Sequence, residues 1–436
     1  MTVAPPSVPE FDAFVDSAVR AAVPDAADFA TLLEQLPGIS PPDALRALRE
    51  IRDSNPAITN LIVSALDRAA TPGLDQGRGL PLPHPLDMEW RFSTDTVSAL
   101  LEQLLDASKE NDAILLLGVP SVAAAASRSS ARREFQVVGE NNVICRALEM
   151  STEGDSRFVH GSVGTRLATA ALVDPPWYLD AYVDMLTTCS ARCAIGATVL
   201  LVLPPIGVRP AAKADQAKMI EAAAAAGLEP IQASARVTYR TPLFELAAWR
   251  AAGIGAWLPN WRSGELIAFV KRREPRPCSV VTARPPAFEL TLAGVRLTLL
   301  LDRAGPIELE AVVHGEVLPS VSARLPERAR ATLWTSGNRA FAVESSYALP
   351  AMAALATSSG LVLPMGLGSG ENRIGAGAAV DVIEALTHQI AGLVARETAT
   401  ALALVGDAGW LRTLSDARFS GSPWQASPKS HRGAVA

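Results

Sequence analysis

The sequence predicts an α/β protein built around a mostly parallel sheet. Between residues 112 and 270, short apolar runs alternate with helical patterns, and several runs end at a glycine or proline turn. Continuous apolar runs of this kind indicate strands buried on both faces, and their alternation with helices indicates parallel pairing. After residue 287 the pattern changes to period-two alternation, which is typical of half-buried antiparallel strands.

Proline and glycine clusters divide the 436 residues into several parts. Residues 73–85 read as a linker, and residues 275–286 mark a second boundary. The predicted parts are an N-terminal helical region (1–80), an α/β domain (81–275), a small β domain (287–345), a C-terminal helical region (346–419) and a disordered tail (420–436). The first of these is expected to be a helical cap or an oligomerisation segment, so a homo-oligomer is a possibility that stays open.

Composition is that of an ordinary globular protein, with 19% charged residues and a net charge of −6. No basic-then-apolar leader opens the chain and no apolar run is long enough to span a bilayer, so we expect a cytoplasmic protein without a membrane partner. The acidic balance disfavours nonspecific nucleic-acid binding.

Cys189 and Cys193 are four residues apart, but no nearby ligand completes a metal set, which predicts buried thiols and no metal.

The apolar run 168–173 is the expected central strand, and it stops at Asp174-Pro175-Pro176-Trp177. Proline cannot donate to a sheet ladder, so the strand must end here. Ligands of open α/β sheets bind at the carboxyl ends of the strands. A carboxylate and a carbonyl there can accept the hydrogens of an amino group, while the indole stacks on the ring that bears it.

Asp-Pro-Pro-Trp resembles the catalytic tetrapeptide of S-adenosylmethionine-dependent amino-methyltransferases, particularly the adenine-N6 type. The resemblance covers roughly residues 85–275 and implies a Rossmann-like class I methyltransferase sheet. It also implies S-adenosylmethionine as cofactor and methyl transfer to an amine. Asp174 and the Pro175 carbonyl would then hold the amine, and Trp177, with Tyr178 beside it, would stack on its ring. The alternative for the motif is a strand-ending turn.

Three strand ends supply the expected cofactor residues. Gly118 and Pro120 form the turn after the first strand, although the resemblance implies more glycines there. Glu140 follows the second strand about twenty residues later, a spacing that suits a carboxylate on the ribose hydroxyls, with Asn141 beside it. His160 ends the third strand next to the expected adenine loop. The competing interpretations are a solvated turn for Glu140 and an uninvolved loop histidine for His160.

The segment before the first helix of the α/β domain contains Phe92, Ser93 and Thr94. An aromatic residue followed by Ser and Thr resembles the element that closes over the methionine end of the cofactor in DNA amino-methyltransferases. The usual proline after the threonine is missing here. Packing of Trp90 and Phe92 in the core is the other interpretation, and Ser93 or Thr94 is also a suitable helix cap.

Substrate contacts are predicted from two basic segments. Arg209 lies in the loop after the fifth strand, and Arg328 and Arg330 belong to a basic cluster, from Arg324 to Arg339, that contains Trp334 in the small β domain. Basic side chains interleaved with an aromatic ring can hold a polyanion. The predicted acceptor is therefore a nucleic acid or a small-molecule amine, and a solvated face with one buried tryptophan is the alternative for the second segment.

Two further functions stay open at this stage. The same fold can transfer an aminopropyl group to a polyamine, a reaction that needs no ring-stacking residue. The chain could also be a non-catalytic scaffold or partner subunit, since only Gly118 stands in the first loop.

Overall fold

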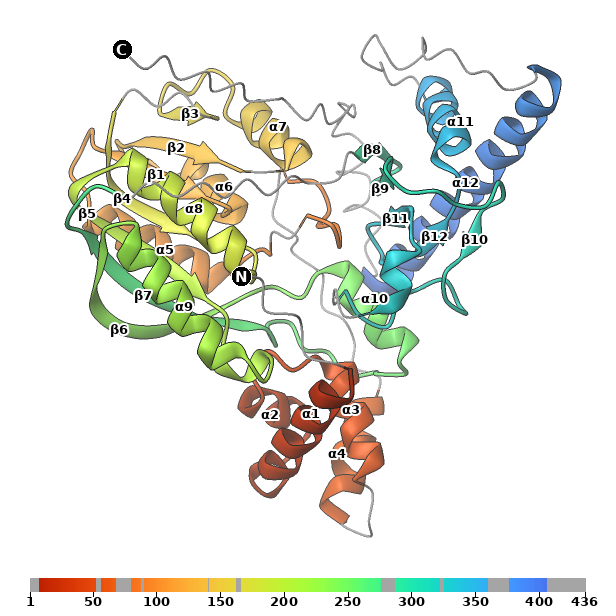
Figure 1. Ribbon diagram of the computed structural model, residues 1–436, viewed down its shortest axis with the longest axis horizontal. Coiled ribbons are helices and arrows are strands. Elements are labelled where there is room, and N and C mark those ends of the chain that lie inside the picture. Colours follow the sequence, from red (N-terminus) through yellow and green to blue (C-terminus); the bar gives the residue numbers. More distant parts are fainter. Residues whose placement is uncertain are drawn as a thin grey trace.

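A computed structural model describes most of the chain, in three connected parts (Figure 1). The described residues are 8–51, 56–67, 80–87, 90–139, 141–161, 166–275, 287–321, 325–359 and 376–405. A large sheet with helices on both faces forms one part, N-terminal helices form the second, and a small sheet with two helices forms the third. No helix within these ranges is long and apolar enough to cross a membrane.

The large sheet confirms the predicted α/β fold. Its strands are β1 (Ala113–Leu117), β2 (Glu134–Val138), β3 (Phe158–His160), β4 (Ala168–Val173), β5 (Cys193–Leu203), β6 (Leu228–Thr238) and β7 (Ser263–Lys271). They lie in the order β3-β2-β1-β4-β5-β7-β6. β7 is antiparallel to β5 and to β6, while the pairings among β1 to β5 are parallel. This is the Rossmann-like class I arrangement that the order of elements predicts.

Helices cover both faces of this sheet. They are α5 (Thr94–Asp106), α6 (Pro120–Arg128), α7 (Asn142–Ser151), α8 (Leu179–Arg192), α9 (Ala212–Ala225) and α10 (Leu243–Ala251), with the short turn η2 (Ile206–Val208). Side chains of β4 alternate between two cores: Ala170 and Leu172 pack in one, and Ala171 and Val173 in the other. Cys189 and Cys193 lie in the second core with their Sγ atoms 3.8 Å apart, which confirms the predicted buried thiols.

Helix α7 is an element that the sequence pattern did not predict. The pair Asn141-Asn142 reads as a polar turn, yet the Asn141 side chain accepts a hydrogen bond from the Ile144 amide and caps this helix. Asparagine is as typical of a helix N-cap as of a turn, so composition alone does not separate the two.

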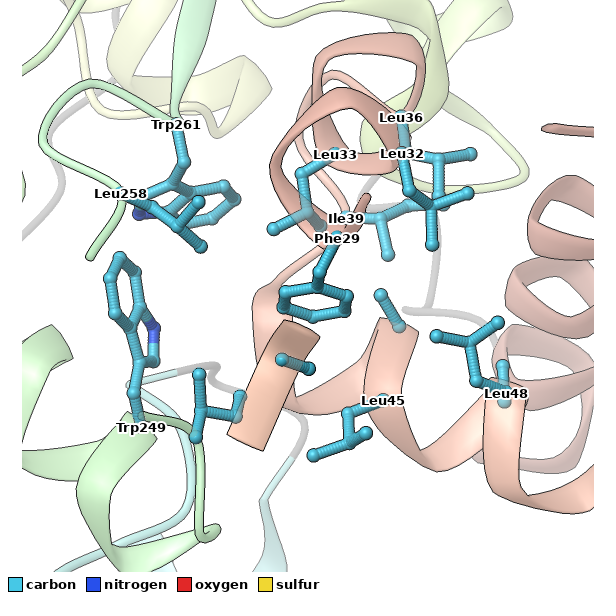
Figure 2. Close-up of a cluster of buried hydrophobic side chains, with 14 of the residues drawn as sticks. Phe29, Leu32, Leu33, Leu36, Ile39, Leu45, Leu48, Trp249, Leu258 and Trp261 are labelled. Carbon is cyan, nitrogen blue, oxygen red and sulfur yellow. The ribbon is translucent and has the colours of Figure 1, made fainter. Parts of the chain in front are cut away.

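The N-terminal helices are α1 (Val8–Ala22), α2 (Phe29–Gln35), α3 (Pro41–Glu50) and α4 (Pro56–Leu66), with the turn η1 (Val23–Asp25). Helices α3 and α4 are separate, and the Ser40 side chain caps α3 by accepting a hydrogen bond from the Asp43 amide. These helices share a core with α10 and the segment after it. Figure 2 shows Trp249 and Trp261 facing Phe29 and Leu33 across this core.

The C-terminal part contains β8 (Ala287–Leu292), β9 (Val295–Leu300), β10 (Glu310–Ala311), η3 (Pro326–Ala329), β11 (Leu333–Thr335) and β12 (Ala340–Ala342). Their sheet has the order β10-β12-β11-β9-β8. Helices α11 (Ser345–Ser358) and α12 (Ala376–Val405) pack on it. β10 is the shortest strand of this sheet, with two residues, and the predicted disordered tail lies outside the described residues.

A buried ion pair joins the C-terminal part to the α/β domain. Arg296 on β9 donates to both carboxylate oxygens of Asp87, at 2.5 and 2.8 Å, and also to the Leu82 carbonyl. Asp87 additionally accepts from the Asn141 side chain at 2.7 Å. Since Asn141 stands just beyond the carboxyl end of β2, this network anchors the C-terminal sheet next to the edge at which β1 and β4 also end.

Candidate functional site

The site is located where the strand order of the large sheet reverses direction, between β1 and β4. In open α/β sheets, ligands bind at this switch point beyond the carboxyl ends of the strands. Gly118 follows β1 and Asp174 follows β4, and the Asp174 amide donates to the Leu117 carbonyl at 3.1 Å. Gly118 has φ +69°, and a Cβ there would stand 2.8 Å from the Asp174 carbonyl oxygen. Glycine is therefore required for the two strand ends to approach this closely.

Asp174 is a buried carboxylate, 7% exposed, with a phenol directed at it. The Tyr239 hydroxyl donates to its Oδ1 at 2.9 Å. Burial, together with the nearby Asp174 charge, raises the pKa of Tyr239 well above its usual value, so Tyr239 stays a neutral donor. A carboxylate accepts several hydrogen bonds, and the one from Tyr239 fixes the orientation of Oδ1.

Trp177 is half-buried and belongs to an aromatic group around Tyr239. Its ring is perpendicular to the Tyr239 ring, with centroids 6.2 Å apart. Trp90 packs edge-on against the same tyrosine and against Phe244. The Arg262 guanidinium lies between the two indoles, 3.7 Å from the Trp90 centroid and 4.0 Å from that of Trp177. Tyr239 and Arg262, both distant in sequence, therefore contact Trp177 of the Asp-Pro-Pro-Trp turn.

Glu245 on α10 adds a second buried carboxyl group near this cluster. It is 5% exposed, and burial raises its pKa to about 7, although the Arg262 charge acts in the opposite direction. The site therefore contains a group that titrates near neutral pH.

Arg209 holds the turn instead of facing an open surface. It forms an ion pair with Asp215 at 2.8 Å and donates to the Trp177 carbonyl at 3.2 Å. Tyr178, at 45% exposed, is the most accessible residue of the turn and precedes α8. Arg209 positions Trp177, while a direct substrate contact by Arg209 stays a prediction.

The predicted cofactor residues occupy different environments. Gly118 has the left-handed conformation expected of a tight turn, and Pro120 begins α6. Glu140 lies outside the described residues. His160 ends β3, and its Nε2 is 2.8 Å from the Thr152 hydroxyl. The Asn141 side chain caps α7 through Oδ1 and donates to Asp87 through Nδ2, and its contact with a cofactor stays a prediction.

The lead-in segment is mainly structural. Phe92 is fully buried and stacks on Tyr239 with centroids 4.8 Å apart. Ser93 caps α5 and bonds to Thr238, and Thr94 accepts from Arg240. Phe92 therefore reaches the site through Tyr239, which favours the core interpretation of this residue.

The second basic segment divides into buried and exposed residues. Trp334 is 1% exposed in the core of the C-terminal part, which corrects its predicted role as a stacking surface. Arg328 lies over its ring at 5.0 Å and donates to the Val321 carbonyl. Burial lowers the pKa of Arg328. Arg330 is exposed.

Sequence reasoning missed Tyr239, Arg262 and Glu245, and it treated Trp90 only as a packing residue. The position of Tyr239 could have been found in part from the order of elements, because Tyr239 follows the carboxyl end of β6 and β6 runs parallel to β4. Arg262 precedes antiparallel β7, whose amino end lies at the same edge. Within the described ranges, no His, Cys, Asp and Glu side chains form a group that could hold a metal ion.

No family model and no curated protein matches this chain. Among solved structures, a branched-chain polyamine synthase from Thermus thermophilus, in complex with N4-aminopropylspermidine and 5'-methylthioadenosine, aligns at 13% identity over 62% of this chain and 91% of its own, with TM-score 0.44. The N-methyltransferase NodS from Bradyrhizobium japonicum WM9 aligns at 12% identity over 42% and 99%, with TM-score 0.28.

A geranyl diphosphate C-methyltransferase from Streptomyces coelicolor A3(2), in complex with Mg2+, geranyl diphosphate and S-adenosyl-L-homocysteine, aligns at 15% identity over 40% of this chain and 79% of its own, with TM-score 0.27.

Proposed function

We propose that this protein transfers a methyl group from S-adenosylmethionine to an amino group on a planar ring. The observation that carries the proposal is the position of Asp174, buried at the switch point, beside Gly118 and within the same turn as Trp177. A carboxylate, a proline carbonyl and an indole at one strand end match the needs of an aromatic amine, as the sequence pattern predicts.

The chain's own residues fit a nucleoside cofactor at this edge. Gly118 lets the turn after β1 pack directly against the Asp174 carbonyl, so the ends of β1 and β4 lie together at this edge. The carboxyl end of β2, which comes shortly before the α7 cap at Asn141, lies beside the end of β1. When bound, the cofactor supplies an electrophilic methyl group and leaves as S-adenosylhomocysteine.

Positioning is the main contribution of the protein in this mechanism. Asp174 and the Pro175 carbonyl accept the amine hydrogens and aim the nitrogen lone pair, and the Asp174 carboxylate takes the proton that the amine loses. Tyr239 fixes one oxygen of that carboxylate at 2.9 Å. Trp177 stacks on the acceptor ring. Orientation of this kind supplies a large part of the rate enhancement in group transfer.

Adenine N6 in a nucleic acid is one acceptor of this type, and a small aromatic amine is another. Aminopropyl transfer to a polyamine is the alternative on the same fold. It gains nothing from Trp177 as a ring stacker. A non-catalytic role is the third candidate, since only one glycine stands in the first loop.

Calorimetry with S-adenosylmethionine separates an enzyme from a scaffold. We expect binding by wild type and an unchanged dissociation constant for Asp174→Ala. Transfer of labelled methyl groups to a panel of nucleosides, aromatic amines and oligonucleotides should be abolished by Asp174→Ala. Absence of cofactor binding by the wild type contradicts the proposal, and equal loss of binding and transfer in the variant places Asp174 in the cofactor site or the core.

A further inference from the structure

Among the described residues, the Arg262 guanidinium is held by contacts with the faces of two aromatic rings and not by hydrogen bonds from its N–H groups. Its Cζ lies 3.7 Å from the centroid of Trp90 and 4.0 Å from that of Trp177. Cation–π contacts of this geometry stabilise a desolvated cation by roughly 0.5–2 kcal/mol each. They leave the edge of the guanidinium plane, where all its N–H groups point, available for hydrogen bonds.

One of these donors has no partner in the described part of the chain. Nε of Arg262 is buried there without a hydrogen-bond acceptor. A buried donor without a partner typically costs about 1–3 kcal/mol, and more when the group is charged. Burial correspondingly lowers the pKa of Arg262, with Glu245 and Asp174 acting in the opposite direction through space. Such a group indicates an acceptor atom that a ligand brings to the site.

The position of Arg262 relates this donor to the reacting amine. It stacks on Trp177, which is three residues after Asp174, and Asp174 also acts electrostatically on it. A ligand held by Asp174 would therefore lie near the Arg262 guanidinium. The planar fork of arginine binds carboxylate and phosphate oxygens in a bidentate manner.

We propose that Arg262 binds an oxyanion of the acceptor, which is a planar amine carrying a carboxylate or a phosphate near the amino-bearing ring. This inference rests on the proposed function, since it assigns the substrate class of the same site. It disfavours a polyamine acceptor, which has no oxygen for Arg262 and would add positive charge next to it. Two like charges at about 4 Å repel by roughly 1–4 kcal/mol, depending on the local dielectric.

The test is calorimetry of the full chain, saturated with S-adenosylhomocysteine, against two matched pairs of probes and spermidine. Aniline is compared with anthranilate, and adenosine with adenosine 5'-monophosphate, so that each pair differs in one oxyanion. We expect the charged member of at least one pair to bind about tenfold more tightly. The pair that responds distinguishes carboxylate from phosphate. No preference in either pair, or spermidine as the tightest ligand, overturns the proposal.

Variants assign the preference to Arg262. Arg262→Gln should reduce the preference to within about threefold, while Arg262→Lys should keep part of it, because the charge remains and the fork is lost. Arg272→Gln is the matched control; this arginine lies just beyond the other end of β7, where it pairs with Glu229. A preference that persists in Arg262→Gln, with an unchanged thermal midpoint, overturns the assignment.

Two controls separate failure of this inference from failure of the proposed function. If Arg262→Gln weakens S-adenosylhomocysteine but not 5'-methylthioadenosine, Arg262 binds the cofactor carboxylate, and the acceptor assignment is wrong while the methyltransferase proposal stands. If the wild type does not bind S-adenosylhomocysteine, the proposed function fails. The probe titrations are also run without cofactor, so the oxyanion preference is measured in either case.

Discussion

The Tyr239 hydroxyl donates a 2.9 Å hydrogen bond to Oδ1 of Asp174, across 65 positions of the sequence. Tyr239 follows β6, and Asp174 follows β4. Phe92 stacks on the Tyr239 ring from one side, and the indoles of Trp90 and Trp177 meet it edge-on. This packing fixes the phenol, and through the hydrogen bond it fixes the carboxylate that we place against the acceptor amine.

Replacing Tyr239 by Phe should slow methyl transfer and leave cofactor binding intact. A hydrogen bond to a charged group contributes about 1.5–3 kcal/mol, which corresponds to at least about tenfold in rate if Asp174 loses its orientation. Tyr182→Phe is the control, because Tyr182 is equally buried near Asp174 but donates to the Val202 carbonyl at 2.7 Å. Equal slowing by both variants would show a packing effect instead.

Gly118→Ala should lower both stability and affinity for S-adenosylhomocysteine. Its φ is +69°, and the added Cβ would meet the Asp174 carbonyl oxygen at 2.8 Å and the Met185 methyl at 3.0 Å. Gly253→Ala isolates the backbone effect, because Gly253 has φ +83° and nothing within 4 Å of the added atom. We expect the control to lose about 1–2 kcal/mol and to keep its affinity. Similar losses in the two variants, with affinity retained, would contradict the close approach of β1 and β4.

Stability should fall as pH rises toward neutrality because of Glu245. Its pKa in the folded protein is raised to about 7 from 4.5, so between these values the folded state binds more protons than the unfolded state. Ionisation then destabilises the fold by up to about 3 kcal/mol. Urea unfolding midpoints between about pH 5 and pH 8 should decrease in wild type and change less in Glu245→Gln. Parallel pH profiles would refute this role of Glu245.

Breaking the Arg296–Asp87 pair should destabilise the protein strongly. Both side chains are 1% exposed, so Arg296→Met leaves the Asp87 carboxylate buried without its cation, at a cost of about 3–5 kcal/mol. Arg272→Met removes an exposed pair with Glu229 and should cost no more than about 1 kcal/mol. Chemical unfolding of the full chain measures both. A loss in Arg296→Met as small as in the control would mean that the C-terminal sheet is held by other contacts.

If the acceptor is a nucleic acid, Arg330 is the exposed arginine of the predicted pair and should contact phosphate. Arg328 instead donates to the Val321 carbonyl and covers Trp334. Arg330→Ala should then reduce the salt dependence of oligonucleotide binding by roughly one unit of slope. Labelled single- and double-stranded oligonucleotides, titrated at low and moderate salt, provide the measurement. No oligonucleotide binding at low salt, with cofactor binding intact, would favour a small-molecule acceptor.

Local patterns of the sequence determined the elements of the large sheet and the turn at its centre. Apolar runs identify β1, β4 and β5 because strands buried on both faces have few polar positions. Pro175 and Pro176 end β4, so that Asp174 is the first residue after the strand. Gly118 marks the turn after β1. These are short-range effects of backbone geometry, so the chain itself carries them. Asn141 shows their limit, since the same residue suits a turn and a helix cap.

Tertiary structure alone decided which side chains surround that turn. Tyr239, Arg262 and Glu245 arrive from β6, from the segment before β7 and from α10, and only the pairing of β7 between β5 and β6 brings them to the edge where β4 ends. Burial likewise separated Trp334 from Arg330, although both belong to one basic segment. Contacts and burial depend on residues far away in sequence, and for this reason no local pattern of composition or spacing contains them.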